Sequence, residues 1–159
     1  MQSPPNLICP LTHPSSLQKS DNTIIHVLLS TDLISLCFRI TETGSELSRT
    51  VAIFIIYNIL VCEIGLTYIC HTYERLFAVG TVLSNMVNSL VETQNVRLLK
   101  YVVRCYLSLS DNLRAREVLR ACFPEPLRDN TFAALLQVSY PQRTFIPVFI
   151  QEEFYLHTE

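Results

Sequence analysis

The sequence predicts an all-α protein built as an armadillo-like helical solenoid. From Asp21 onward, apolar residues recur at the i, i+3, i+4 spacing of amphipathic helices. The composition agrees, because 49% of the residues are hydrophobic while only three are glycine, too few for a turn-dense β fold. Helices of similar kind also recur with a period just over 45 residues, close to the spacing of armadillo and HEAT repeats.

Helix-ending and helix-starting residues divide the helical region. Ser30 and Thr31 are expected to cap one helix, and Gly44 with Ser45 ends one helix and starts the next. The run 110–112 and the prolines at 124 and 126 mark two further joints. The predicted helices cover residues 22–30, 32–42, 46–61, 63–70, 72–92, 94–109, 112–122 and 128–138.

The repeat is visible in the positions of these helices rather than in their letters. The helices predicted from Glu46 and Gln94 begin 48 residues apart, and those from Glu63 and Asn112 begin 49 apart. Such units cannot bury their apolar faces alone and therefore stack side by side. The layout predicts two full units and the beginning of a third.

Three regions are expected along the chain. Residues 1–20 hold four prolines among serines and are expected to be a disordered extension. Residues 21–138 form the armadillo-like helical domain. Residues 139–159 are expected to be an irregular tail, because Pro141 and Pro147 forbid a continuous helix.

One predicted helix carries a basic strip. Arg97, Lys100, Tyr101, Arg104 and Ser108 share a face, while the remainder of residues 97–109 is apolar and must be packed by neighbours. Residues 97–128 carry a local charge of +4, although the whole chain carries −2. This strip could bind the phosphates of single-stranded nucleic acid, with Tyr101 stacking a base. The alternative interpretation is the solvated edge of a buried helix.

Composition and motifs exclude several classes of function. The six cysteines form no CxxC pair and are read as buried, reduced thiols, which predicts no metal site. The longest apolar stretch, from Val51 to Cys62, is too short to span a bilayer, so no membrane association is expected. No phosphate-binding glycine motif occurs, and no histidine has a nucleophile and a carboxylate at motif spacing. We expect no catalytic residues, no cofactor and no enzyme activity.

Several segments in order resemble one protein family. They are LSTDLISLCFRI (29–40), GSELSRTVA (44–52), GLTYICHTYER (65–75), RLLKYVVRCYLSLSDN (97–112) and RAREVLR (114–120). From about Ile24 to Leu136 the chain is similar to the Rcd-one family, the "required for cell differentiation" proteins, also called Caf-forty or CNOT-nine. This family is the armadillo-type subunit of the Ccr–Not mRNA deadenylase complex.

The resemblance implies a non-catalytic adaptor in mRNA deadenylation, mRNA decay and translational repression, found in the cytoplasm, including P-bodies, and in the nucleus. It implies docking on the Not scaffold subunit and binding of Trp-containing or short helical peptides from mRNA-recruiting proteins. Tyr73, Arg75 and Arg114 match positions at the family's tryptophan pockets, where stacking and cation–π contacts would hold an indole. Val51 matches a position on a groove that takes helical peptides.

The sequence also departs from the family pattern. The family's earlier armadillo units have no counterpart before Ile24, so the resemblance implies a solenoid truncated at its N-terminal side. Docking on the Not scaffold is therefore in question. The missing units also predict exposed apolar flanks and self-association. Leu113 stands where the family usually has proline, and the helix 46–61 is more apolar than in its relatives. Besides the adaptor, two alternatives therefore stay open: a nucleic-acid-binding solenoid and a truncated remnant that does not assemble.

Overall fold

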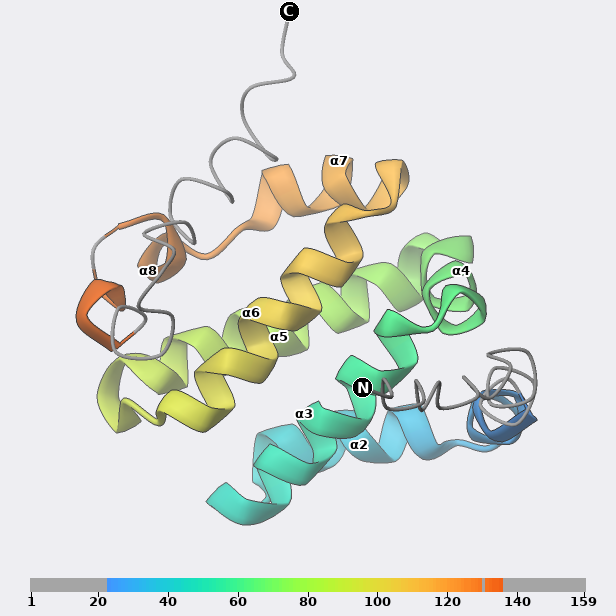
Figure 1. The fold of residues 1–159 in the computed structure, drawn as a ribbon, viewed down its shortest axis with the longest axis horizontal. Coiled ribbons are helices and arrows are strands. Elements are labelled where there is room, and N and C mark those ends of the chain that lie inside the picture. Colours follow the sequence, from blue (N-terminus) through green and yellow to red (C-terminus); the bar gives the residue numbers. More distant parts are fainter. Residues whose placement is uncertain (1–22, 130, 136–159) are drawn as a thin grey trace, which may run out of the picture.

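The computed structural model describes residues 23–129 and 131–135, and these residues form helices with no strand (Figure 1). The all-α prediction is therefore confirmed for the described part of the chain. After a first helix, Thr23–Ser30, the elements are α2 (Leu33–Thr43), α3 (Glu46–Val61), α4 (Glu63–His71), α5 (Tyr73–Thr93), α6 (Val96–Ser110), α7 (Leu113–Cys122) and α8 (Glu125–Arg128).

Corresponding helices of successive units lie side by side, as a solenoid requires. α3 packs along α6, and α2 packs against α5 (Figure 1). The starts of α3 and α6 are aligned, because the Asn95 side chain at the start of α6 donates a hydrogen bond to the Glu46 carboxylate at the start of α3. α3 and α6 begin 50 residues apart, and so do α4 and α7. The predicted solenoid is thus confirmed, with a slightly longer repeat.

Side-chain caps fix where several helices begin. The Ser45 hydroxyl accepts a hydrogen bond from the Ser48 amide at α3, and the Thr72 hydroxyl accepts one from Arg75 at α5. Asn95 and Asn112 cap α6 and α7 in the same way. Each such cap contributes about 1 kcal/mol. The predicted boundaries at Gly44–Ser45 and at residues 110–112 are confirmed.

Ser30 and Thr31, predicted to cap one helix, close the C-terminal end of the first helix, because their hydroxyls donate to the carbonyls of Val27 and Leu28. One local prediction is wrong. The helix predicted over 128–138 does not start at Arg128. Instead a short helix, α8, forms before it and ends at Arg128. α8 can include Pro126 because a proline is tolerated in the first turn of a helix. Helix resumes only at 133–135. The Asp129 carboxylate accepts the Thr131 amide and forms the turn between them. Residues 136–138 lie outside the described part.

The core lies where α5 and α6 meet α3 and α7. α6 is apolar around most of its circumference and is buried on several sides, as its sequence predicts. Burying each such leucine or valine contributes about 1.5–3 kcal/mol before the entropy of ordering is counted. The most deeply buried side chains of α5 and α6 are Leu76, Leu83, Val87, Leu90, Leu99, Val102, Cys105 and Leu109.

No single helix in the described residues is long and apolar enough to cross a bilayer, although two bent pairs, Thr23–Ser30 with Leu33–Thr43 and Glu46–Val61 with Glu63–His71, pass by length and composition together. The expected extension at 1–20 and the expected tail at 139–159 lie outside the described residues.

Candidate functional site

The last turn of α4 positions two of the predicted tryptophan-pocket residues. Arg114, from the first turn of α7, donates from Nη1 to the carbonyl oxygens of Cys70 (3.3 Å) and His71 (2.9 Å). Arg75, from the first turn of α5, donates from Nη1 to the Tyr68 carbonyl at 3.4 Å. A helix C-terminus leaves carbonyls without intrahelical partners and carries a partial negative charge, so both guanidinium groups are held there.

Tyr73 and Arg114 come together on the surface. The Tyr73 side chain is 61% exposed at the start of α5, and the Arg114 Cζ atom lies 5.3 Å from its ring centroid. The pair therefore makes a cation–π contact while keeping much of the phenol open to solvent. Arg114 also acts on its surroundings: burial raises the pKa of the Cys70 thiol, and the positive charge of Arg114 opposes that rise.

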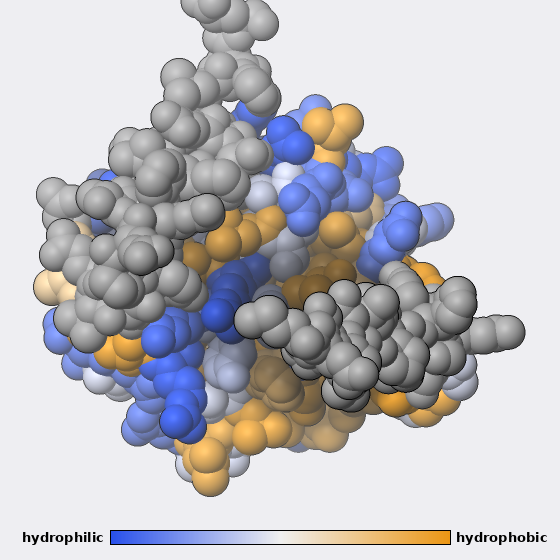
Figure 2. Space-filling model, in the orientation of Figure 1, coloured by the Kyte–Doolittle hydropathy of each residue, from blue (hydrophilic) through white to orange (hydrophobic). Residues whose placement is uncertain are grey.

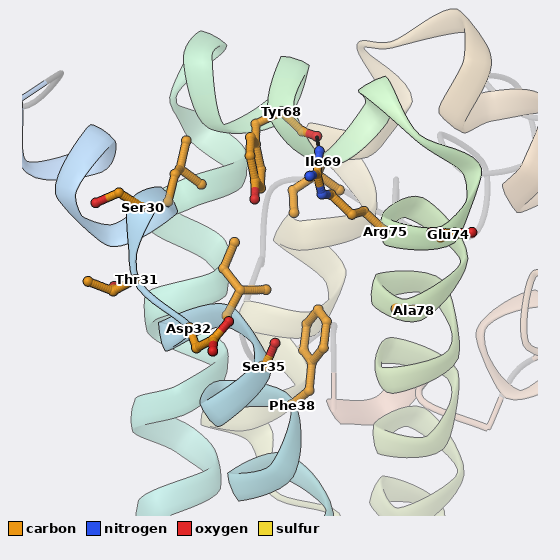
Figure 3. Close-up of a pocket in the computed structure, with 12 residues that line it drawn as sticks. Ser30, Thr31, Asp32, Ser35, Phe38, Tyr68, Ile69, Glu74, Arg75 and Ala78 are labelled. Carbon is orange, nitrogen blue, oxygen red and sulfur yellow. Dashed lines mark hydrogen bonds between the residues drawn. The ribbon is translucent and has the colours of Figure 1, made fainter.

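Arg75 faces a separate cavity of about 510 Å³ (Figure 3). Its Cζ atom lies 4.0 Å from the centroid of the Tyr68 ring, a close cation–π contact. The cavity opens between the turn that precedes α2, the end of α4 and the start of α5, and neither Tyr73 nor Arg114 lines it. Figure 3 shows Tyr68 and Arg75 on one side and Phe38 and Ser35 of α2 on the other. The structure thus divides the three predicted residues between two subsites.

Val51 belongs to an apolar row on the outer surface of α3. The row, which we call the α3 seam, follows the spacing i, i+4, i+7, i+11, i+14, and every member is exposed. Val51 itself is 51% exposed. Alternating steps of four and three residues make the narrow stripe that one helix presents to another in a coiled coil. The α3 seam consists of the apolar side chains Leu47, Val51, Phe54 and Val61 and one polar side chain, Asn58.

The basic residues predicted on α6 share a face beside the α3 seam. Arg97 and Arg104 are exposed and Lys100 is half-buried; we call these three residues the basic strip. Figure 2 shows hydrophobic surface over α3 next to hydrophilic surface over the middle of α6. Tyr101 packs edge-on against Phe54 with ring centroids 5.3 Å apart and lies 6.0 Å from Tyr57.

Sequence reasoning did not single out three residues of these surfaces. Tyr68 stacks on Arg75, and Leu47 and Phe54 complete the α3 seam. The 3–4 spacing of Leu47, Val51 and Phe54 within an otherwise apolar helix was the available signal for the seam. Tyr68 had no such signal, because its stacking on Arg75 depends on how α4 meets α5 at Thr72.

These surfaces contain aromatic rings, guanidinium groups and an apolar row. In the described part of the chain, no group of three or more His, Cys, Asp or Glu side chains is placed to hold a metal ion. Five cysteines fall in that part and all are free thiols, four of them buried or half-buried. Side chains of these kinds can bind aromatic or helical ligands through stacking and apolar packing.

The fold and these surfaces define an armadillo-type helical-repeat protein that presents aromatic, basic and apolar side chains on stacked helices. Comparison of the sequence with known families gives a specific result: residues 14–147 match the family described as "Cell differentiation family, Rcd1-like". The match covers most of the chain, and the protein belongs to this family.

Two relatives show how similar the chain is to characterised members. It is 60% identical over 123 residues to the cell differentiation protein rcd1 of Schizosaccharomyces pombe, covering 77% of this chain and 44% of that protein. It is 52% identical over 124 residues to the protein CAF40 of Saccharomyces cerevisiae, covering 77% of this chain and 33% of that protein. The chain therefore spans less than half the length of these curated relatives.

Proposed function

We propose that this protein is a non-catalytic adaptor of the Ccr–Not complex that acts in mRNA deadenylation, mRNA decay and translational repression. Membership of the Rcd1-like family supports the proposal, as do the exposed aromatic and apolar side chains and the arginines of the surfaces described above. The proposal includes docking on the Not scaffold subunit and residence in the cytoplasm, including P-bodies, and in the nucleus.

The observation that carries the proposal is the open Tyr73 ring beside an anchored Arg114. An indole held between the two groups would need about 7 Å, twice a van der Waals separation of about 3.5 Å. The 5.3 Å between the Arg114 Cζ atom and the ring centroid is shorter. A tryptophan would therefore lie on the outer face of Tyr73 with its edge against Arg114, and we propose this arrangement in place of a sandwich.

The absence of tryptophan from the chain allows a direct test. A short Trp-containing peptide is titrated with the whole protein, and the indole fluorescence, which comes only from the peptide, is followed. We expect a blue shift on binding and a 2- to 30-fold weaker affinity for Tyr73→Ala, about 0.5–2 kcal/mol. Arg39→Ala, which changes an exposed arginine on α2, is the matched control. Equal affinities for the wild type and Tyr73→Ala would overturn this site.

Scaffold docking needs its own test, because it does not depend on the indole site. Co-expression with a fragment of the Not scaffold subunit, followed by co-purification and size-exclusion chromatography, is expected to give a stable complex. Tyr73→Ala should remain in that complex. Failure of the wild-type protein to co-purify would refute the role as a complex subunit, whatever the peptide titration shows.

Nucleic-acid binding is the second candidate, supported by the exposed arginines of the basic strip and by the absence of acidic residues from 96 to 110. The predicted role of Tyr101 has less support, because contacts with Phe54 and Tyr57 already occupy its ring. A gel shift with single-stranded RNA at low and physiological salt tests this candidate, and absence of binding at low salt would exclude it.

A further inference from the structure

Tyr73 is the one tyrosine among the described residues whose side chain is exposed. It is 61% exposed, and its hydroxyl makes no hydrogen bond within the described part of the chain. The other described tyrosines are half-buried or buried, and each packs against a neighbouring ring or guanidinium group; they are Tyr57, Tyr68, Tyr101 and Tyr106. Tyr73 is therefore the phenol that a modifying enzyme reaches with the least disturbance of the fold.

The backbone around Tyr73 is helical on one side only. Tyr73 is the first residue of α5, and Thr72 before it has extended backbone, with φ −120° and ψ 142°, at the corner between α4 and α5. Phosphoryl transfer needs the acceptor oxygen in line with the leaving group of ATP, so the acceptor segment must enter the cleft of the kinase. Only the first turn of α5 has to open for this, and the ends of helices open more readily than their middles.

Arg114 is placed to pair with a phosphoryl group on Tyr73. Its Cζ atom lies 5.3 Å from the Tyr73 ring centroid, and both of its hydrogen bonds to the end of α4 come from Nη1. Its Nε and Nη2 atoms make no hydrogen bond within the described residues, so they can donate as a fork to two phosphoryl oxygens.

The start of α5 also favours a negative charge. The side chain of a first-turn residue points back toward the helix N-terminus, where unpaired amides carry a partial positive charge. The nearest acidic side chain in the sequence is Glu74, which is exposed. Adjacent residues of a helix do not face each other, so this carboxylate does not lie beside the phenol of Tyr73.

We propose that Tyr73 is a tyrosine-phosphorylation site, and that its phosphoryl group pairs with Arg114 and closes the indole site. A protein tyrosine kinase catalyses the reaction with ATP. Tyr73 Oη attacks the γ-phosphorus, an O–P bond forms, the bond to ADP breaks, and the phenolic proton passes to the base of the kinase.

The product carries about −1.5 to −2 charges at neutral pH. This charge keeps water around the ring and engages Arg114, so an indole loses both of its contacts. The loss of peptide binding rests on the proposed function, whereas the modification of Tyr73 and its pairing with Arg114 do not.

The site is tested by incubating the full chain with ATP, Mg²⁺ and the catalytic domain of a broad-specificity tyrosine kinase, while mass spectrometry follows each tyrosine separately. We expect Tyr73 to be modified about tenfold faster than any other described tyrosine, because the packed ones require a wider opening of the fold. Tyr57→Phe is the control and should leave the rate at Tyr73 unchanged. Absence of phosphate at Tyr73, or equal rates at Tyr73 and Tyr101, would overturn the proposal.

The pairing with Arg114 is tested on the phosphorylated protein. Phosphorylation should raise the thermal unfolding midpoint by about 2 °C in the wild type but not in Arg114→Ala. Arg39→Ala is the matched control and should respond as the wild type does. Equal shifts in the wild type and Arg114→Ala would overturn the pairing.

Closure of the indole site is tested with the Trp-containing peptide described above. We expect the phosphorylated wild type to bind it about tenfold more weakly than the unmodified protein does. Equal affinities would overturn the closure. If the unmodified protein does not bind the peptide, the proposed indole site fails alone, and the mass spectra and unfolding midpoints still decide whether Tyr73 is modified and pairs with Arg114.

Discussion

Arg114 Nη1 donates to the His71 carbonyl oxygen at 2.9 Å and so ties the first turn of α7 to the last turn of α4. A cation in the first turn of a helix is disfavoured by the positive end of that helix's own dipole. Here the guanidinium group reaches the negative end of another helix, where cations are favoured. The bond also holds the group 5.3 Å from the Tyr73 ring, so one side chain links two structural units and forms part of the candidate indole site.

Arg114→Ala should therefore lower both stability and peptide affinity. Losing an exposed, charged hydrogen bond to a helix end is expected to reduce the free energy of unfolding by about 1 kcal/mol, measured by urea denaturation. Arg114→Lys keeps the charge but not the guanidinium fork, and should recover only part of that loss. Unchanged unfolding midpoints for both variants would show that the hydrogen bonds from Arg114 to the end of α4 do not stabilise the fold.

Much of the fold was predictable because it depends on local signals. Helical periodicity and capping depend on residues that lie within a few positions of one another in the sequence. The helix boundaries at Gly44–Ser45 and at 110–112 lie where these local signals predict them. The segment after α7 was not predicted. Pro124 and Pro126 read as breakers, yet α8 begins directly after Pro124 and takes Pro126 into its first turn.

The candidate site was predictable only in part, and for a different reason. Arg114 donates a hydrogen bond to the carbonyl of Cys70, which lies 44 residues earlier in the sequence. No local sequence pattern predicts a contact between residues so far apart. The family resemblance supplied Tyr73, Arg75 and Arg114 as a group, but the structure assigns Arg75 to the cavity lined by Tyr68. Which subsite a residue joins depends on the angle between helices, and that angle follows from packing of the whole core.

The two buried glycines of the described residues should respond oppositely to alanine. A Cβ at Gly65 would lie 2.0 Å from the Ile59 carbonyl oxygen, a backbone atom at the corner between α3 and α4. Gly65→Ala should lower the free energy of unfolding by about 3 kcal/mol. At Gly80, inside α5, the nearest atom would be the Cys122 sulfur at 3.8 Å. Gly80→Ala should therefore stabilise by about 0.5–1 kcal/mol. Thermal unfolding followed by circular dichroism checks the pair, and equal shifts would contradict the close approach at Gly65.

Stability should fall in alkali because buried acids cannot ionise in the folded state. Burial raises the pKa of the Cys105 thiol well above its ordinary value near 9, and burial also raises the pKa of Tyr106. The unfolded chain loses these protons first, so their contribution is complete below about pH 9 and declines above it, by up to about 1.4 kcal/mol per pH unit for each group. Urea denaturation from pH 7 to 10.5 should show this slope, and Cys105→Ala should reduce it. Parallel curves for the two proteins would contradict the assignment to Cys105.

Exposed apolar side chains on the first two helices should cause self-association. Ile24 and Val27 lie on one face of the Thr23–Ser30 helix, and Leu36 is exposed on α2. Exposed apolar side chains on one helix face can form the contact surface of a protein–protein interface. At tens of micromolar, sedimentation velocity should show dimers or larger species. The double variant Ile24→Glu, Val27→Glu should shift the distribution toward monomer, because association would bury two carboxylates without partners. Leu113→Glu, at a side chain that is 74% exposed on α7, is the matched control and should leave the distribution unchanged. A wild-type protein that sediments only as monomer at these concentrations would refute the prediction.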